Sequence, residues 1–189
     1  KRLLAYCSVE HIGIITLGLG LGPAGVFAAL LHTLNHALSK APAFFSAGRL
    51  GQVYGTYDMG EIRGAAKGEP LWGSALLGSL LALIGVSPFG LFISELLLLR
   101  AALGQGRYLV AGMFLFGCST AFIGILRHAL EMAWGEPPAQ LGARRRSGLL
   151  EWGLVVAVFF ALLLLGLWLP PPLCRALEAA AATVAGGGR

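Results

Sequence analysis

Charged residues are scarce in this sequence. Asp, Glu, Lys and Arg make up 12% of the 189 residues, and hydrophobic residues make up 57%. A soluble globular domain averages about a quarter charged and about half apolar residues. The composition therefore excludes an ordinary soluble domain and indicates an integral membrane protein, which agrees with the mean hydropathy of +0.77.

Cysteine is also rare, and no pattern of redox ligands accompanies it. Cys7, Cys118 and Cys174 have neither CxxC spacing nor a compact framework. We interpret them as small buried apolar residues. The sequence offers no flavin, iron–sulfur or nickel ligands, so we predict no cofactor and no active site of its own.

The amino-terminal segment lacks the three-part layout of a signal peptide, and it begins with Lys1 rather than methionine. We therefore expect the chain to be a fragment of a longer protein.

Long apolar stretches predict an all-α polytopic helix bundle that forms a single transmembrane domain. A span needs about 20 apolar residues. The five predicted membrane elements are residues 3–21, 24–50, 71–103, 108–134 and 149–169, followed by a C-terminal tail over 170–189.

The stretch 71–103 is too long for one straight helix. At 1.5 Å per residue it would extend for about 50 Å, against a hydrocarbon core of about 30 Å. Gly85, Pro88 and Gly90 within "IGVSPFG" all weaken a helix. The sequence therefore predicts a broken helix near 85–90. Non-helical backbone at this depth must be buried in protein or line a wet cavity, which favours a functional role.

The distribution of positive charge predicts the orientation in the membrane. On one side, the alternating spans place Lys1, Arg2, Arg49, Arg63, Lys67 and Arg144 to Arg146. On the other side, they place Arg100, Arg107, Arg175 and Arg189. The positive-inside rule assigns the first side to the cytoplasm of a multi-pass protein of the plasma (inner) membrane, with the C-terminus outside. The net charge of +5 is explained by this topology, and we predict no nucleic-acid binding.

Three ionisable residues follow one another at four-residue spacing inside the second predicted span. His32, His36 and Lys40 therefore share one helix face, with about 6 Å of rise between neighbours. Charged groups are costly at the bilayer centre and usually face a polar interior. Imidazole both accepts and releases protons, so the row predicts a proton relay. The alternatives are hydrogen bonding to other helices with snorkelling of Lys40, and a metal shared by the two histidines. No third ligand lies nearby in the sequence, so we predict no metal site.

Two glutamates extend this prediction. Glu95 follows the predicted break, has apolar neighbours and has no cation three or four residues away, so it is the strongest single candidate. It is also compatible with a purely structural hydrogen bond. Glu10 and His11 are adjacent and point to different faces, and we expect Glu10 to reach the bundle interior. In contrast, Arg127 and Glu131 have the spacing of an ordinary ion pair.

Three segments together resemble the C-terminal part of the antiporter-like proton-pumping membrane subunits. They are "KRLLAYCSVEHIGII", "HTLNHALSKAPAFFSAG" and "IGVSPFGLFISELLLL", and the resemblance covers residues 1–135. The family includes the L, M and N type subunits of respiratory complex I and subunits of multisubunit cation/proton antiporters. "VEHIG" and "YGTYDMGEIRG" are most similar to the F-type membrane subunit of formate-hydrogenlyase-type nickel–iron hydrogenases.

The resemblance implies two inverted five-helix repeats, each with a broken helix, within a bundle of about fourteen helices. This chain would hold most of the second repeat. The family's channel residue on the second broken helix corresponds to Glu95, and its loop lysine corresponds to Lys1. Its connecting residues correspond to His32, His36 and Lys40. Pro42 departs from the family pattern.

The sequence and the resemblance together predict a proton-translocating subunit of a respiratory-type oxidoreductase complex. Its partners would be other membrane and peripheral subunits, the lipid bilayer and protons. Two alternatives stay open: a cation/proton antiporter subunit without a redox partner, and a structural subunit that no longer conducts protons.

Overall fold

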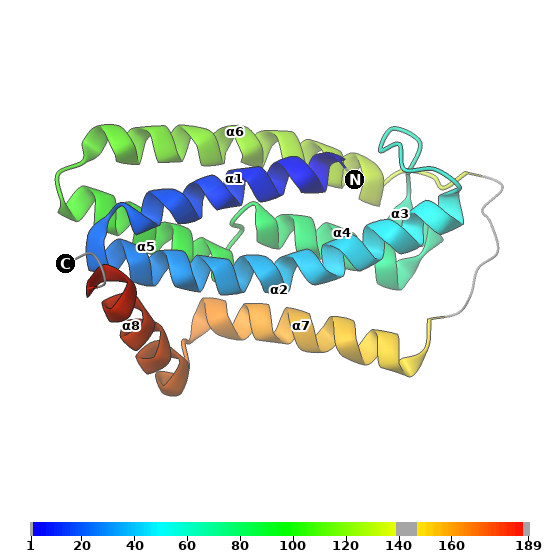
Figure 1. Cartoon of the computed structure of the whole chain (residues 1–189). Coiled ribbons are helices and arrows are strands. Elements are labelled where there is room, and N and C mark those ends of the chain that lie inside the picture. Colours follow the sequence, from blue (N-terminus) through cyan, green and yellow to red (C-terminus); the bar gives the residue numbers. More distant parts are fainter. Residues whose placement is uncertain (1, 139–146, 187–189) are drawn as a thin grey trace.

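The computed structural model describes residues 2–138 and 147–186, and Figure 1 shows that these residues form a helical bundle with no strand among them. The helices are α1 (Arg2–Leu19), α2 (Gly22–Tyr54), α3 (Ala65–Gly68), α4 (Pro70–Leu83), α5 (Gly90–Gly104), α6 (Tyr108–Ala133), α7 (Leu149–Leu167) and α8 (Pro171–Gly186). Lys1 and Arg144 to Arg146 lie outside the described residues.

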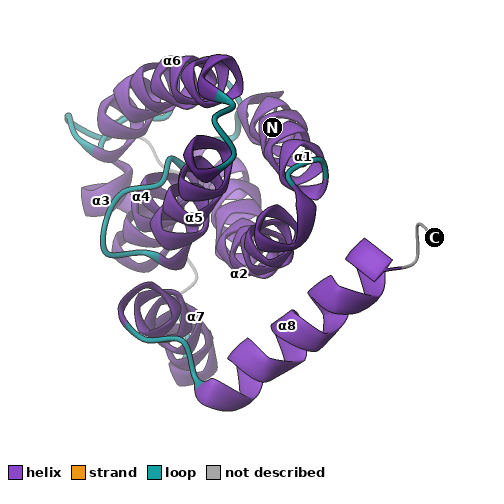
Figure 2. Cartoon of the chain, turned by 90° about the vertical axis from the view of Figure 1, so that its left-hand side faces the viewer, coloured by secondary structure: helices purple, strands orange, loops and turns teal. Residues whose placement is uncertain are grey.

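Helices α4 and α5 follow one another through the middle of the bundle. Viewed along the helix axes, α6 lies above α4 and α5, α1 and α2 lie to their right, and α7 lies below them (Figure 2). Helix α2 is continuous over 33 residues although Pro42 lies inside it. The candidate site lies where side chains of α1, α2 and α5 meet.

The predicted interruption lies between Leu83 and Gly90. Gly85 adopts a left-handed backbone with φ of 68°, which favours a residue without Cβ. The Ser87–Pro88 peptide bond is cis. Backbone hydrogen bonds from Val86 to Leu81 and from Phe89 to Val86 close the connection as tight turns. The break is therefore a compact segment in which Gly85, Val86 and Phe89 are half-buried, whereas Ser87 and Pro88 are exposed.

Three of the described helices, α1, α6 and α7, are long and apolar enough to cross a membrane by length and composition. Helix α2 contains the histidine and lysine row, which lowers its hydropathy. At 1.5 Å per residue, α4 and α5 each reach only about 20 Å, less than a hydrocarbon core of about 30 Å. The count of five spans stays a prediction.

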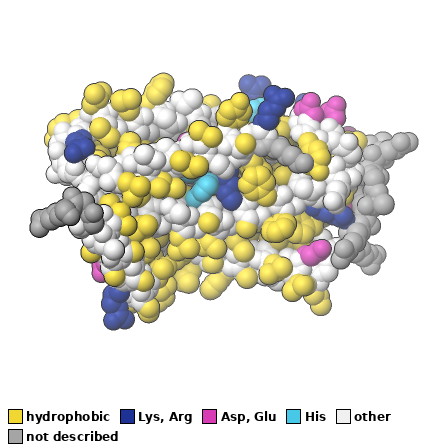
Figure 3. Space-filling model, viewed as in Figure 1, with side chains coloured by type: hydrophobic (Ala, Val, Ile, Leu, Met, Phe, Trp, Pro, Cys, Tyr) yellow, Lys and Arg dark blue, Asp and Glu magenta, His cyan; other side chains and the backbone are white. Residues whose placement is uncertain are grey.

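The outer surface of the described helices is apolar, unlike that of a soluble protein. Large apolar side chains are exposed along the outside, for example Leu109 at 77% and Phe116 at 76%. Figure 3 shows one such face, with cations and acids gathered toward its two ends. One histidine and one neighbouring cation reach the surface in the middle of that face. This distribution is expected where lipid, rather than water, covers the helices.

The C-terminal stretch described from the sequence as a tail contains a helix. Helix α8 packs against α2 and crosses the bundle axis at the end where α1 finishes (Figures 1 and 2). Ala181 is buried on one side of α8, whereas Arg175 and Glu178 are exposed. Alanine-rich composition favours this helix, and its amphipathic faces fit a position along the surface of the bundle.

Candidate functional site

Buried polar side chains concentrate where α1, α2 and α5 meet. Those from these three helices are His11, His32, Asn35, Ser39, Lys40, Ser46 and Ser94. Buried polar groups cost free energy unless they are paired, so such a concentration requires a hydrogen-bond network.

A hydrogen-bonded chain links the three helices. His11 Nδ1 lies 2.9 Å from His32 Nε2, and His32 Nδ1 lies 2.9 Å from Ser94 Oγ. Ser94 Oγ donates its own proton to the Leu91 carbonyl at 2.8 Å. His32 therefore donates from Nδ1 to Ser94, and its Nε2 accepts from His11 Nδ1. In this neutral arrangement, His11 Nε2 carries a lone pair, and that buried atom has no partner at hydrogen-bond geometry. The Leu83 backbone also lies close to the His11 ring.

The His11 ring connects the two histidines of α2. Its centroid lies 5.0 Å from that of His32 and 4.5 Å from that of His36. His36 Nε2 is a second buried atom without a partner. The row predicted along one face of α2 is therefore supplemented by a third imidazole from α1.

Lys40 extends the cluster by one further turn of α2. Its side chain is only 7% exposed, and Nζ donates to the Leu4 carbonyl of α1 at 2.6 Å. The ammonium group also interacts with the Cys7 thiol and the Glu10 carboxylate. It therefore turns into the interface between α1 and α2 instead of snorkelling along α2.

Glu95 lies on α5, one residue after Ser94, and is half-buried. A carboxylate oxygen of Glu95 and nitrogens of His11 and His32 all lie within 4.8 Å of one another. The carboxylate also packs against Gly85, where an added Cβ would lie 3.0 Å from Glu95 Cδ. The left-handed glycine of the break thus leaves room for this carboxylate beside the histidines.

Asn35 fixes the start of α5. Its Nδ2 donates to the Gly90 carbonyl at 2.9 Å, and the side chain is fully buried. A Cβ on Gly90 would lie 2.8 Å from Asn35 Cγ, so glycine is required for this close approach. Asn35 belongs to α2, which means that one helix holds both the break and the histidine row.

Most of the residues proposed from the sequence meet in this cluster. His32, His36, Lys40 and Glu95 lie together, and Glu10 is half-buried at its edge. Gly85, Pro88 and Gly90 form the break. Lys1 lies outside the described residues.

The residue that the sequence reasoning missed is His11, which is 1% exposed. We expected Glu10 to reach the interior in its place. The sequence contained a signal for this position, namely the spacing of the residues that α1 buries. These residues alternate in steps of three and four: Leu4, Cys7, His11, Ile14 and Gly18. This spacing defines a helix face, and His11 lies on it whereas Glu10 does not. The Arg127–Glu131 pair, in contrast, forms as predicted at 3.0 Å.

The sequence matches a family model described as NADH:quinone oxidoreductase/Mrp antiporter, transmembrane, over residues 1–124. The chain belongs to this family. Among its curated relatives in the family is the hydrogenase-4 component F homolog of Methylacidiphilum infernorum, 34% identical over 90% of this chain and 35% of the relative. Another is the putative antiporter subunit mnhD2 of Staphylococcus aureus, 31% identical over 72% of this chain and 28% of the relative. The chain spans about a third of the length of these relatives.

Solved structures of antiporter-family assemblies have the same fold. A chain of the Mrp complex from Dietzia sp. superposes with a TM-score of 0.82 at 27% identity, covering 98% of this chain and 42% of that one. A chain of respiratory complex I from Thermus thermophilus superposes with a TM-score of 0.80 at 26% identity, covering 97% and 38%. The predicted fold class and family resemblance are confirmed.

Proposed function

We propose that this chain is part of a proton-translocating membrane subunit of a respiratory-type oxidoreductase complex. The observation that carries the proposal is the buried chain Ser94–His32–His11, with the tilted His36 ring 4.5 Å from that of His11 and Glu95 beside it. Imidazole exchanges protons near neutral pH, so hydrogen-bonded imidazoles form a path for protons through an apolar protein. The subunits named in the comparisons belong to hydrogenase, complex I and antiporter assemblies, which supports membership in a multisubunit complex.

In the proposed mechanism, a proton passes between Lys40 and Glu95 by way of His36, His11 and His32. His11 accepts a proton at Nε2 and passes its Nδ1 proton to His32, since the two nitrogens are already hydrogen-bonded. The unpartnered nitrogens of His11 and His36 are positions for bridging water, because buried polar atoms bind protein or water. Rotation of each imidazole then resets the path.

Electron transfer in this proposal belongs to other subunits, and conformational change in the complex drives the transfer of protons. The distribution of cations in the sequence supports a cytoplasmic location for the start of α1 and the end of α2. The C-terminus would then lie outside, and Glu95 would serve the outward half of the path.

The proposal is tested in the full-length protein, assembled in its complex and reconstituted in vesicles. Glu95→Gln is expected to lower proton transport at least tenfold, because glutamine does not carry a proton. Glu131→Gln is the matched control: Glu131 is exposed on α6 and pairs with Arg127, outside the cluster. Normal assembly with unchanged transport in both Glu95→Gln and Lys40→Met would favour the structural role.

A second candidate is a cation/proton antiporter subunit without a redox partner. The similarity to mnhD2 and the match to the Mrp complex favour it. The two functions differ in their driving force. Transport that requires sodium and continues without electron flow would favour the antiporter, whereas transport that requires electron flow would favour the oxidoreductase complex.

A further inference from the structure

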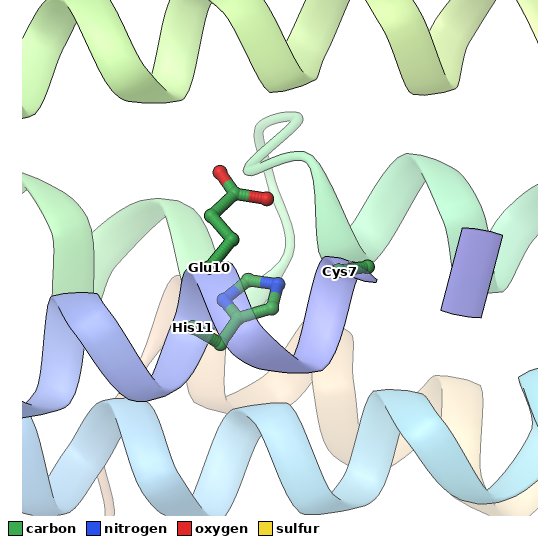
Figure 4. A group of neighbouring side chains, drawn as sticks. All are labelled: Cys7, Glu10 and His11. Atoms are coloured by element: carbon green, nitrogen blue, oxygen red, sulfur yellow. The ribbon is translucent and has the colours of Figure 1, made fainter. Parts of the chain in front are cut away.

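We infer that Cys7, Glu10 and His11 form a binding site for a zinc-like divalent metal ion on α1. One ligand atom from each residue lies within 4.8 Å of the other two. Figure 4 shows the three side chains on neighbouring turns of α1, with one ring nitrogen of His11 turned toward Cys7. A tetrahedral zinc site has bonds of about 2.0–2.3 Å and ligand atoms about 3.5 Å apart, so small side-chain rotations would complete the set.

The hydrogen bonding of His11 matches that of a metal ligand. A metal-bound histidine normally donates its other ring N–H to a partner, which fixes the ring and its tautomer. His11 already donates from Nδ1 to His32, and its buried Nε2 carries a lone pair without a partner. The Leu83 backbone also lies close to the His11 ring, so a metal at Nε2 requires the tautomer in which this nitrogen carries no proton.

The charge and type of the ligands select the metal. Thiolate and carboxylate together cancel the charge of a divalent ion, and a neutral complex avoids the cost of a net charge in an apolar interior. Sulfur and imidazole nitrogen favour zinc over calcium or magnesium, which prefer oxygen. Binding releases the thiol proton of Cys7, because the thiolate is the ligand.

A second group, His11, His32 and Glu95, is less suitable for a metal. It has only one carboxylate, so a divalent ion would leave a buried positive charge. Its two imidazoles are also hydrogen-bonded to each other, and a metal would have to break that hydrogen bond. At the first group, Glu10 borders a groove of about 280 Å³ with Met113, Gly117 and Cys118, which leaves its carboxylate room to turn.

Lys40 opposes metal binding, because its ammonium group interacts with both Cys7 and Glu10. Removing this charge is therefore expected to strengthen binding. A bound metal would also occupy the His11 lone pair and block the proton path, a consequence that rests on the proposed function.

The site is tested by titrating the full-length protein, in its complex, with cadmium and zinc. Cadmium is expected to produce a thiolate-to-metal charge-transfer band that zinc displaces. Cys7→Ser should abolish the band, and the matched Cys118→Ser should keep it. Glu10→Gln should keep the band but weaken binding at least tenfold, and Lys40→Met should tighten it.

A wild-type protein without the band, or an equal band in Cys7→Ser, would overturn the site whatever happens to transport. Zinc is also added to vesicles that contain the complex, where it should inhibit proton transport in wild type and not in Glu10→Gln at the same concentration. A band without inhibition would leave the site standing and contradict the role of His11 in the proton path.

Discussion

Replacing Gly85 by alanine is expected to damage proton transport more than stability. Two effects can be separated. Alanine at a φ of 68° costs about 1–2 kcal/mol of folding free energy, because Cβ approaches the following carbonyl. The new Cβ would also lie 3.0 Å from Glu95 Cδ and 3.2 Å from Oε1, so the carboxylate must move away from the break.

Gly106 supplies the matched control for the first effect. It also has a φ of 68°, and no atom lies within 4 Å of a Cβ placed there. Gly106→Ala and Gly85→Ala should therefore lower the free energy of unfolding by a similar amount, about 1–2 kcal/mol. Thermal unfolding of the purified full-length protein measures this comparison.

Transport should differ between the two variants. Displacing a reacting group by about 1 Å can lower a rate about 100-fold, and Gly85→Ala displaces the Glu95 carboxylate from its present position beside His11 and His32. We expect proton transport in vesicles to fall at least tenfold in Gly85→Ala and to stay within twofold of wild type in Gly106→Ala. Equal transport by the two variants, with equal assembly, would refute the reasoning that the break positions Glu95.

Two further predictions concern the helices that hold the break. Gly166→Ala should destabilise the protein by about 1–3 kcal/mol through overpacking, because the new Cβ would lie 2.7 Å from the carbonyl carbon of Phe89. The control is Gly153→Ala, also on α7, where open space surrounds the added Cβ. Thermal unfolding measures both variants. Asn35→Leu should cost about 1–3 kcal/mol by leaving the Gly90 carbonyl unpaired, and unchanged unfolding would show that water replaces the amide.

The interruption between α4 and α5 could be predicted because its cause is local. Gly85 and Pro88 limit helix formation wherever they occur. The row of His32, His36 and Lys40 was likewise visible, since four-residue spacing places residues on one helix face whatever surrounds the helix. The predicted helix break is confirmed, since α4 ends at Leu83 and α5 begins at Gly90, whereas the role of the row in proton transfer stays a prediction.

The partners of these residues could not be predicted in the same way. The hydrogen bond between His11 and His32 joins residues of different helices, and the one from His32 to Ser94 spans 62 positions. Both depend on how the helices pack. We expected Glu10 in the interior because of its charge, and gave less weight to the spacing of the apolar residues of α1. An imidazole is, however, less costly to bury than a carboxylate.

The contacts of the break explain why it lies beside the histidines and not elsewhere in the bundle. Irregular backbone inside a membrane protein needs partners for its polar groups. Asn35 supplies one from α2 at Gly90, and Gly166 lets α7 pack directly against Pro88 and Phe89. Asn35 lies one residue before His36, so any shift of the first turn of α5 acts on the helix that carries the histidine row. The break and the proton path thus share an anchor, and a rearrangement of α5 that moves Glu95 would also act on His32 and His36.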